Sequence, residues 1–369
     1  FRSVLDMKFL DWLRLLRSVG AGRCGYVVKI HHKFQKFNHT GAMEYVAGID
    51  IGGTKCAVVL GHRAGNGEIT ILDKKAFPTG KRPYPEVLDE FFSTVEEILS
   101  GRKAALSQVA AFGISCGGPL DSKRGVIMSP PNLPGWDNVP IVRLFEERFG
   151  VKTGIQNDAN ACALAEWQFG AGRGAQNVVF LTFGTGMGAG LILDGRLYSG
   201  TNDMAGEVGH MAMRPFGPVG YGKAGSFEGF CSGGGIAQLA RNRAMEALQM
   251  GGGVGYCPDP ASLDGITARS VAEAARQGDP AALEVYRTSG ELLGEGLSIL
   301  IDVLNPETIV IGSIFARAHD LLWPAAESVI RRQSLSYARE VCRVVPAGLG
   351  EQIGDYAALS VAVYTASQR

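Results

Sequence analysis

The sequence predicts an α/β fold in which two related domains face each other across a central cleft. Strand and helix patterns alternate from Met43 onward, which is typical of α/β layers. The stretches AGIDIGGTKCAVVL and FLTFGTGMGAGLIL share the order strand, Gly/Thr turn, strand. Two copies of one pattern indicate two related domains, and ligands usually bind in the cleft between such domains.

The individual elements follow from hydrophobic patterning. EYVAGIDIGG and KCAVVLG predict two strands joined by a glycine turn, and VAAFGIS predicts a buried strand. PEVLDEFFSTVEEILSG carries its apolar residues on one helical face, with Gly101 as the expected C-terminal cap. KTGIQ predicts a strand, and NDANACALAEWQFG opens the helix behind it. NVVFLTFGTGMGAGLILDG predicts a second strand–turn–strand unit, and a later long helix ends at Asn305-Pro306 before the strand ETIVIGS.

These elements predict a small domain at 43–156, with a C-terminal helix at 355–369 packed on it, and a large domain at 157–354. Residues 1–42 are expected to lie outside this core. They hold eight Lys or Arg against two Asp, a net charge of about +6. Two interpretations are open, an upstream extension and the remnant of a DNA-binding arm, and the first is favoured.

Composition argues against several classes of protein. The 369 residues are 46% hydrophobic, enough for a large core, and a formal net charge of zero gives no global basic surface for nucleic acid. No uninterrupted apolar stretch is long enough to span a bilayer. Seven scattered cysteines without a CxxC pair predict reduced thiols in a cytoplasmic protein rather than a disulfide framework.

The first glycine turn, DIGGTK, has two interpretations. It is not a Walker A loop, which requires G-x-x-x-x-G-K-[ST] before a helix. Gly52 and Gly53 would permit close approach of a phosphate. Thr54 and Lys55 would donate to it, and Asp50 would hold a hydrated Mg²⁺. A plain hairpin, with Asp50 bonded to its own turn, accounts for the same residues.

The second glycine loop, FGTGMGAG, is followed by a predicted strand. It is therefore not a dinucleotide fingerprint, which requires a helix at that point. A phosphate-facing hairpin, with Thr185 bonding the phosphate, is the better interpretation. A simple turn is the alternative, but two such turns in matching contexts weaken it.

Polar residues at the junction QNDAN also have two interpretations. Asn157 and Asp158 are good helix N-caps, which is a purely structural role. The functional hypothesis makes Asp158 a general base, because phosphoryl transfer to an alcohol needs a carboxylate that accepts the hydroxyl proton. Asn132 in SPPNLPGW would contact a polar substrate or form an Asx turn.

Two acids and a histidine follow in GEVGHMAM and GSFEGF. Glu207, His210 and Glu228 would suit the grip of several vicinal hydroxyls, since each carboxylate accepts two hydrogen bonds. Their spacing alone is a weak signal, because a single histidine is more often structural and exposed acids are often only solvated.

Four stretches together resemble the ROK family of repressors, open reading frames and sugar kinases. They are GIDIGGTK, NDANACALAEWQFGAG, LTFGTGMGAGLILDGRLYSG and EVGH, in this order, and the resemblance covers residues 43–369. It implies the actin-like, ribonuclease-H-like ATPase fold, with ATP and a hexose meeting in the cleft. It also implies a homodimer.

The resemblance assigns a role to each matching position. It implies that Asp158 is the catalytic base. The implied sugar-binding residues are Gly118, Asn132, Asn157, Glu207, His210 and Glu228. The implied residues for ATP are Asp50 (also near Mg²⁺, through water), Gly52, Gly53, Thr54, Lys55, Gly184, Thr185, Gly186 and Gly312. Ser313 stands where the family often has a second glycine.

One departure from the family concerns zinc. Many ROK proteins carry C-x-C-G-x-x-G-C-x-E after the E-x-G-H histidine, but here the stretch reads VGYGKAGSFE. Val219, Tyr221 and Ser226 occupy the three cysteine positions, so only His210 of the four ligands is present. Structural zinc needs four ligands, and we therefore predict none at this site. Packing and hydrogen bonds must then orient His210.

The sequence thus predicts a cytoplasmic ATP-dependent sugar kinase. The resemblance implies that glucose is the first expected substrate, phosphorylated at C6. Neither membrane nor nucleic acid is expected as a partner. The alternatives are a sugar-responsive ROK repressor and a non-catalytic sugar-binding protein. Residues 1–42 show no two-helix DNA-binding pattern, and the retained Asp50, Thr54 and Lys55 favour the kinase.

Overall fold

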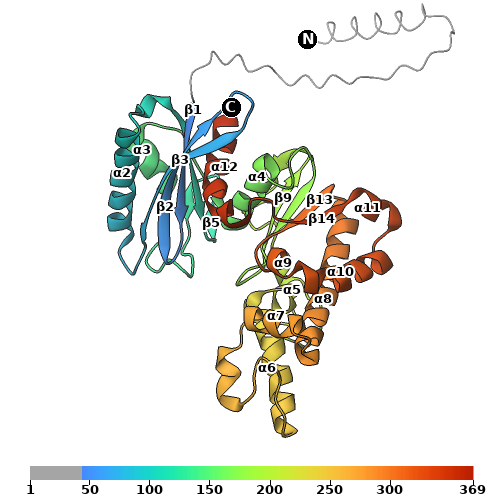
Figure 1. Ribbon diagram of the computed structural model, residues 1–369. Helices are drawn as coiled ribbons and strands as arrows, with labels where there is room; N and C mark the ends of the chain where they lie inside the picture. The colour runs from blue at the N-terminus through green and yellow to red at the C-terminus, as the bar shows by residue number, and fades with distance from the viewer. Residues whose placement is uncertain (1–43, 369) are drawn as a thin grey trace, which may run out of the picture. The chain divides into compact units, whose positions relative to one another are not determined.

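The computed structural model describes residues 44–368, so both interpretations of residues 1–42 lie outside the described residues. Two five-stranded sheets organise this part of the chain (Figure 1). The N-terminal sheet has the order β3-β2-β1-β4-β7 and the C-terminal sheet the order β10-β9-β8-β13-β14. We call the parts built on them the N-terminal and the C-terminal lobe.

The strands of the N-terminal sheet are β1 (Glu44–Ile51), β2 (Lys55–Arg63), β3 (Ile69–Pro78), β4 (Val109–Cys116) and β7 (Thr153–Asn157). Those of the C-terminal sheet are β8 (Val178–Leu181), β9 (Ala189–Leu193), β10 (Arg196–Leu197), β13 (Thr308–Ile311) and β14 (Arg343–Pro346). Two small hairpins complete the strands: β5 (Leu120–Asp121) with β6 (Val126–Ile127), and β11 (Val219–Gly220) with β12 (Lys223–Ala224).

The two large sheets share one topology. In each, the first three strands form an antiparallel meander, and two further strands lie parallel to the first. Strand β1 therefore corresponds to β8, and the glycine turns that follow both strands hold equivalent positions. The predicted fold class, two related α/β units, is confirmed.

Helices cover both faces of each sheet. They are α2 (Tyr84–Gly101), α3 (Ile141–Phe149), α4 (Asp158–Phe169), α5 (Phe227–Phe230), α6 (Gly233–Gln249), α7 (Ala268–Arg276), α8 (Pro280–Leu304), α9 (Ile314–Arg317), α10 (His319–Gln333), α11 (Ser336–Val341) and α12 (Ile353–Ser367). Single 3₁₀ turns lie at η1 (Leu106–Gln108), η2 (Val208–His210), η3 (Pro260–Gly265) and η4 (Gly350–Gln352).

Helix α2 shows why the sequence pattern was informative. Its apolar residues recur every three or four positions and are buried against the N-terminal sheet, where Phe91 packs on Phe77 and Phe145. Gly101, expected as its cap, is instead its last helical residue, and Arg102 follows as the cap. Such shifts of one residue are common at helix ends.

Helix α12 crosses the opposite face of the N-terminal sheet along a row of glycines. Gly48, Gly113 and Gly154 are neighbours in register on β1, β4 and β7. A Cβ atom on Gly113 would lie 2.1 Å from the backbone nitrogen of Ala362, so only glycine lets the helix lie this close. The last strand of each lobe thus leads into a helix that packs on the other lobe, since α4 follows β7 and packs on β8 and β9.

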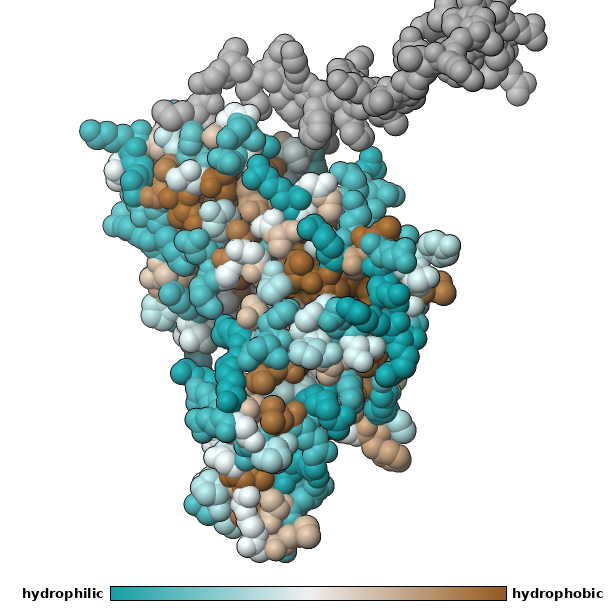
Figure 2. Space-filling view, turned by 45° about the vertical axis from the view of Figure 1, so that its right-hand side comes forward, coloured by the Kyte–Doolittle hydropathy of each residue, from teal (hydrophilic) through white to brown (hydrophobic). Residues whose placement is uncertain are grey.

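No helix in residues 44–368 is long and apolar enough to cross a bilayer. The six cysteines in this range are all free thiols. The face in Figure 2 is largely hydrophilic, with apolar residues in separate small patches.

Candidate active site

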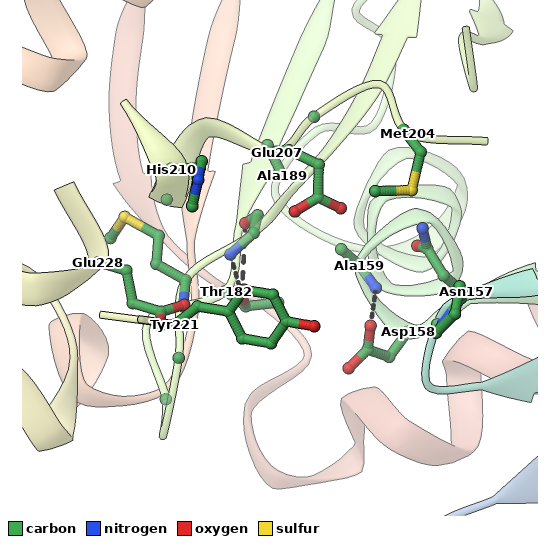
Figure 3. A pocket seen from close by; sticks show the side chains of 18 of the residues that line it. Asn157, Asp158, Ala159, Thr182, Ala189, Met204, Glu207, His210, Tyr221 and Glu228 are labelled. Carbon is green, nitrogen blue, oxygen red and sulfur yellow. Dashed lines mark hydrogen bonds between the residues drawn. The ribbon is translucent and has the colours of Figure 1, made fainter. Parts of the chain in front are cut away.

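A cavity of 650 Å³ lies where the chain passes from β7 into α4. It gathers nine of the residues expected at a site: Gly118, Asn157, Asp158, Gly184, Thr185, Gly186, Glu207, His210 and Glu228. Figure 3 shows Asp158 and Asn157 on one side of this first cavity, and His210 and Glu228 on the other.

The start of α4 gives Asn157 and Asp158 different tasks. Asn157 caps the helix, because its Oδ1 accepts the backbone N–H of Asn160 at 2.8 Å. The Asp158 carboxylate accepts the N–H of Ala159 at 2.9 Å and borders the cavity. Asp158 is exposed to the open cavity, although neighbouring protein atoms displace part of the water around its carboxylate. Burial therefore raises the pKa of Asp158, and backbone hydrogen bonds only partly oppose the rise.

A carboxylate with a raised pKa and no cationic partner is suited to accept a proton. Among the described residues, no ion pair involving Asp158 occurs within 4 Å. A carboxyl group with a raised pKa is a better proton acceptor than an ordinary aspartate. Asp158 can therefore accept a proton from a hydroxyl group bound in the cavity.

The facing wall comes from η2 and α5. Burial raises the pKa of Glu207, and the charges of Asp158 and Glu228 raise it further, while His210 lowers it. Glu228 accepts the backbone N–H of Met187 at 2.9 Å, which fixes it against the second glycine loop. These groups are hydrogen-bond acceptors and a donor of the kind that binds vicinal hydroxyls.

Gly209 explains the glycine of the E-x-G-H pattern. A Cβ atom on Gly209 would lie 2.2 Å from the carbonyl oxygen of Met187. The turn that carries Glu207 and His210 therefore packs directly on the second glycine loop.

The second glycine loop is a tight hairpin between β8 and β9. The N–H of Thr182 donates to the carbonyl of Gly188 at 2.9 Å, and the Thr182 hydroxyl accepts the N–H of Gly188 at 2.8 Å. Gly184 donates to the carbonyl of Gly186 at 3.1 Å. Thr185 lies exposed at the tip, where its hydroxyl and the nearby backbone can meet an anion.

A second cavity, of 980 Å³, shares Gly184 and Thr185 with the first. Three arginines and one glutamate line it: Arg269, Arg276, Arg317 and Glu273. Its walls come from α6, α7 and α9, and Ser313 closes one side. Gly312 is buried just behind Ser313 and does not belong to the lining. Each arginine is paired with a carboxylate, Arg269 with Glu273, Arg276 with Asp320 and Arg317 with Glu351, so the lining is polar and its charges are largely balanced.

Ser313 has a backbone conformation that favours glycine. Its φ is 57° and its ψ is −113°. Its hydroxyl accepts a hydrogen bond from Arg317 Nη2 at 3.2 Å. Such a conformation costs a residue with a side chain about 1–2 kcal/mol.

Ser313→Gly is therefore expected to stabilise the protein by about 0.5–1 kcal/mol, after allowance for the lost bond and for the more flexible unfolded chain. Urea denaturation of both proteins measures this difference. Ser93→Gly is the control, because Ser93 lies in the middle of α2 and its replacement should destabilise by about 0.5 kcal/mol. Destabilisation by both substitutions would contradict backbone strain at Ser313.

The first glycine turn lies outside the lining of both cavities. It closes the β1–β2 hairpin through the N–H of Gly52 and the carbonyl of Lys55 at 3.2 Å, and Thr54 and Lys55 are exposed. Asn132 packs on this turn, since a Cβ atom on Gly53 would lie 2.5 Å from its carbonyl oxygen. Within the stretch SPPNLPGW, which contains Asn132, only Pro131 borders the first cavity.

Asp50 lies at the end of β1, just before this turn. Burial and the neighbouring charge of Asp355 raise the pKa of Asp50 to about 6, and Lys74 and Lys55 oppose the rise. Lys74 is itself paired with Asp355 at 2.5 Å. The Asp50 carboxylate thus carries a charge that the nearby lysines only partly balance, and a hydrated Mg²⁺ with phosphate ligands would balance it.

The residues at the family's zinc position do not fit zinc. Val219 has no ligand atom in its side chain, and the Ser226 hydroxyl is occupied in capping α5 through the N–H of Gly229 at 3.1 Å. No group of three His, Cys, Asp or Glu suited to a metal occurs in residues 44–368. Hydrogen bonds fix the β11–β12 hairpin instead. The Gln238 amide bonds both the N–H and the carbonyl of Val219 at 2.9 Å, and Lys223 Nζ donates to the carbonyl of His210 at 2.6 Å.

Some lining residues were missed in the sequence. Tyr221 was considered only as a lost cysteine, yet it borders the first cavity. Arg276 and Arg317 border the second cavity from helices far apart in the chain, and no local motif marks them. A signal was available only for Ser313, as a serine in place of an expected glycine.

Comparisons with known proteins agree with this geometry. A glucokinase of Streptomyces coelicolor is 33% identical over 329 residues, which are 87% of this chain and 98% of the relative. A solved ROK family glucokinase from Streptomyces griseus, in complex with glucose and AMPPNP, superposes with a TM-score of 0.64 at 30% identity, over 87% of this chain and 99% of that one. The DNA-binding transcriptional repressor Mlc of Escherichia coli is 29% identical over 260 residues, 69% of this chain and 61% of the repressor.

The duplicated sheets and these structural relatives give the chain the actin-like, ribonuclease-H-like ATPase fold. The family model described as "ROK family" matches residues 46–363. This chain belongs to the ROK family.

Proposed function

We propose that this protein is an ATP-dependent kinase that transfers the γ-phosphate of ATP to a hydroxyl of a hexose. The observation that carries the proposal is that two cavities share the turn at Gly184 and Thr185. One cavity holds the acids, the histidine and Asp158, and the other is lined by polar side chains of α7 and α9 together with Ser313. A sugar in the first and a nucleotide in the second would bring a hydroxyl and a phosphate together at this turn.

On the sugar side, Glu207, His210 and Glu228 would bind hydroxyls. Asp158 would accept the proton of the attacking hydroxyl, which its raised pKa and cavity position support. Most of the rate gain in phosphoryl transfer comes from positioning and from charge stabilisation.

On the nucleotide side, the base and ribose would occupy the second cavity beside Ser313. The phosphates would extend over Thr185 towards the first glycine turn, where Thr54 and Lys55 would donate to them. Bound Mg²⁺ would supply positive charge that offsets the charge developing on the phosphate oxygens. Asp50 would hold its water ligands. Because Gly52–Lys55 lie outside both linings, we expect the lobes to close on the bound substrates.

Glucose, phosphorylated at C6, is the substrate that we propose first. The glucokinases among the relatives support this choice. The relationship to the Mlc repressor supports a second candidate, a sugar-responsive repressor. The Asp158 environment favours the kinase, because a protein that only binds sugar has no need of a cavity-lining carboxylate with a raised pKa.

The test is ADP release with ATP–Mg²⁺ across glucose, mannose, fructose, allose, N-acetylglucosamine and N-acetylmannosamine. Each assay is run with and without a zinc-selective chelator, with Mg²⁺ in excess. Turnover of one sugar in both conditions would support a kinase that needs no zinc. Absence of turnover with every sugar, together with salt-dependent DNA binding, would favour the repressor.

A pH-dependent prediction follows from Asp50. Its raised pKa means that the folded protein without ligands binds more protons than the unfolded chain between about pH 4 and pH 6. The charged carboxylate therefore lowers the free energy of unfolding as pH rises through this range. Above pH 7, Asp50→Asn should stabilise the ligand-free protein by about 2 kcal/mol, while turnover with ATP–Mg²⁺ falls.

Urea denaturation of both proteins between pH 4 and pH 8, without nucleotide or Mg²⁺, measures this effect. The difference in unfolding free energy should be small near pH 4 and complete above pH 7. A constant difference across this range would show that Asp50 does not titrate as described.

A further inference from the structure

Tyr221 lies at the tip of the β11–β12 hairpin in an unfavourable backbone conformation. The turn residues Tyr221 and Gly222 have φ values of 42° and 76°, between the paired residues Gly220 and Lys223. A two-residue turn with positive φ at both positions is of type I′, for which Asn-Gly is the preferred sequence. A tyrosine in the first position costs stability that asparagine would not.

The hairpin nevertheless holds Tyr221 in a defined place. The side-chain amide of Gln238 makes two hydrogen bonds to the backbone of Val219, and Lys223 ties the hairpin to the carbonyl of His210. Gly220 packs against α5, since a Cβ atom there would lie 2.6 Å from the nitrogen of Gly229. The tip is therefore fixed relative to the residues that line the first cavity.

The Tyr221 side chain itself has no partner. It is 79% exposed, and within residues 44–368 it makes neither a hydrogen bond nor a ring contact. It borders the first cavity together with Asp158, His210 and Glu228. In the view of Figure 3 the phenol ring lies between the Glu228 side and Asp158, with its hydroxyl directed towards the Asp158 side.

A strained backbone and an exposed aromatic ring both oppose stability, and both are typical of ligand-binding positions. We infer that Tyr221 is a substrate-contacting residue whose ring packs on the apolar C–H face of the bound hexose. The inference rests on the proposed sugar kinase function. The acids bind the hydroxyls at the edge of the sugar ring, and Tyr221 covers its face, so that the sugar is held between the hairpin and α4.

The test compares Tyr221→Asn with Tyr221→Phe. Asparagine suits the type I′ turn, so the melting temperature should stay the same or rise, while the KM for the sugar rises about five- to tenfold. The kcat and the KM for ATP should stay within about twofold, because the reacting groups are untouched. Phenylalanine keeps the ring, and its KM for the sugar should stay within about threefold of the wild type. Tyr337→Asn is the control, since Tyr337 is 86% exposed on α11 and borders neither cavity.

An unchanged KM for the sugar in Tyr221→Asn would overturn the contact, as would equal losses in the Asn and Phe variants. If the wild type phosphorylates no sugar, the kinase proposal fails, and the contact between Tyr221 and the sugar is tested by sugar binding alone. If Tyr221 contacts the sugar, the sugar should raise the melting temperature of the wild type more than that of Tyr221→Asn. Equal shifts, or none in either protein, would overturn it.

Discussion

Asp158→Asn is expected to lower turnover at least about 1,000-fold while sugar binding is retained. Asparagine has nearly the same shape and can still accept the N–H of Ala159, but it cannot take a proton from the substrate hydroxyl. Removal of this charge at the cavity wall should also leave the fold intact. Turnover is measured by ADP release, and sugar binding by the rise in melting temperature that the sugar causes.

The matched control is Asp89→Asn, an exposed aspartate on α2 that borders neither cavity. It should behave as the wild type in both measurements. Turnover by Asp158→Asn within about tenfold of the wild type would remove Asp158 from the role of base.

The pH dependence of kcat/KM in the wild type should also show that Asp158 acts as a base. A base acts only when deprotonated, and the raised pKa of Asp158 moves the loss of activity on acidification above the usual range of aspartate, about 3.9. Asp50, with a pKa of about 6, titrates in the same direction. We therefore expect kcat/KM to fall at a higher pH than an ordinary carboxylate would cause.

The fold was predictable where its signals are local. The two strand–turn–strand stretches appear in the sequence as runs of apolar residues around glycines, and each is an antiparallel hairpin in the structure, with strand ends that differ by about two residues in the first. The cap at Gly101 was wrong by one residue, because helix ends depend on competing hydrogen bonds. The parallel pairing of β4 and β7 beside β1 joins segments far apart in sequence, and no local pattern encodes it.

The residues of the candidate site were also predictable only where they belong to a local motif. Asp158, Glu207 and His210 belong to short motifs, and the structure gathers them in one cavity. Asn132 lies outside the lining of this cavity, with its carbonyl oxygen against Gly53 and its side chain against Gly117, and its assignment to the sugar stays a prediction. The arginines of the second cavity were missed because Arg269 and Arg276 on α7 and Arg317 on α9 belong to no motif.

Glu166→Gln is the substitution for which we expect the largest loss of stability, about 3 kcal/mol. Glu166 is on α4, is fully buried, and accepts three backbone hydrogen bonds. They come from Ala171 at 2.7 Å, Gly348 at 3.1 Å and Leu349 at 2.9 Å. Glutamine replaces one acceptor oxygen with an NH₂ group, which leaves at least one buried N–H facing another donor.

Because of where these hydrogen bonds lie, the loss of stability in Glu166→Gln should be detectable at particular backbone amides. Gly348 and Leu349 lie in the connection from β14 to α12, where the chain returns from the C-terminal lobe to the N-terminal sheet. Glu166 therefore connects α4, the helix that begins with Asp158, to the segment that leads from β14 in the C-terminal lobe to α12 on the N-terminal sheet. In Glu166→Gln, hydrogen exchange at the amides of Gly348 and Leu349 should accelerate more than hydrogen exchange at the amides in the core of β1.

Urea denaturation measures the global loss of stability, with Glu340→Gln on the exposed surface of α11 as the control. Unchanged protection at both amides would mean that the carboxylate does not hold this connection, because no other acceptor is bonded to these two N–H groups in the described part of the chain.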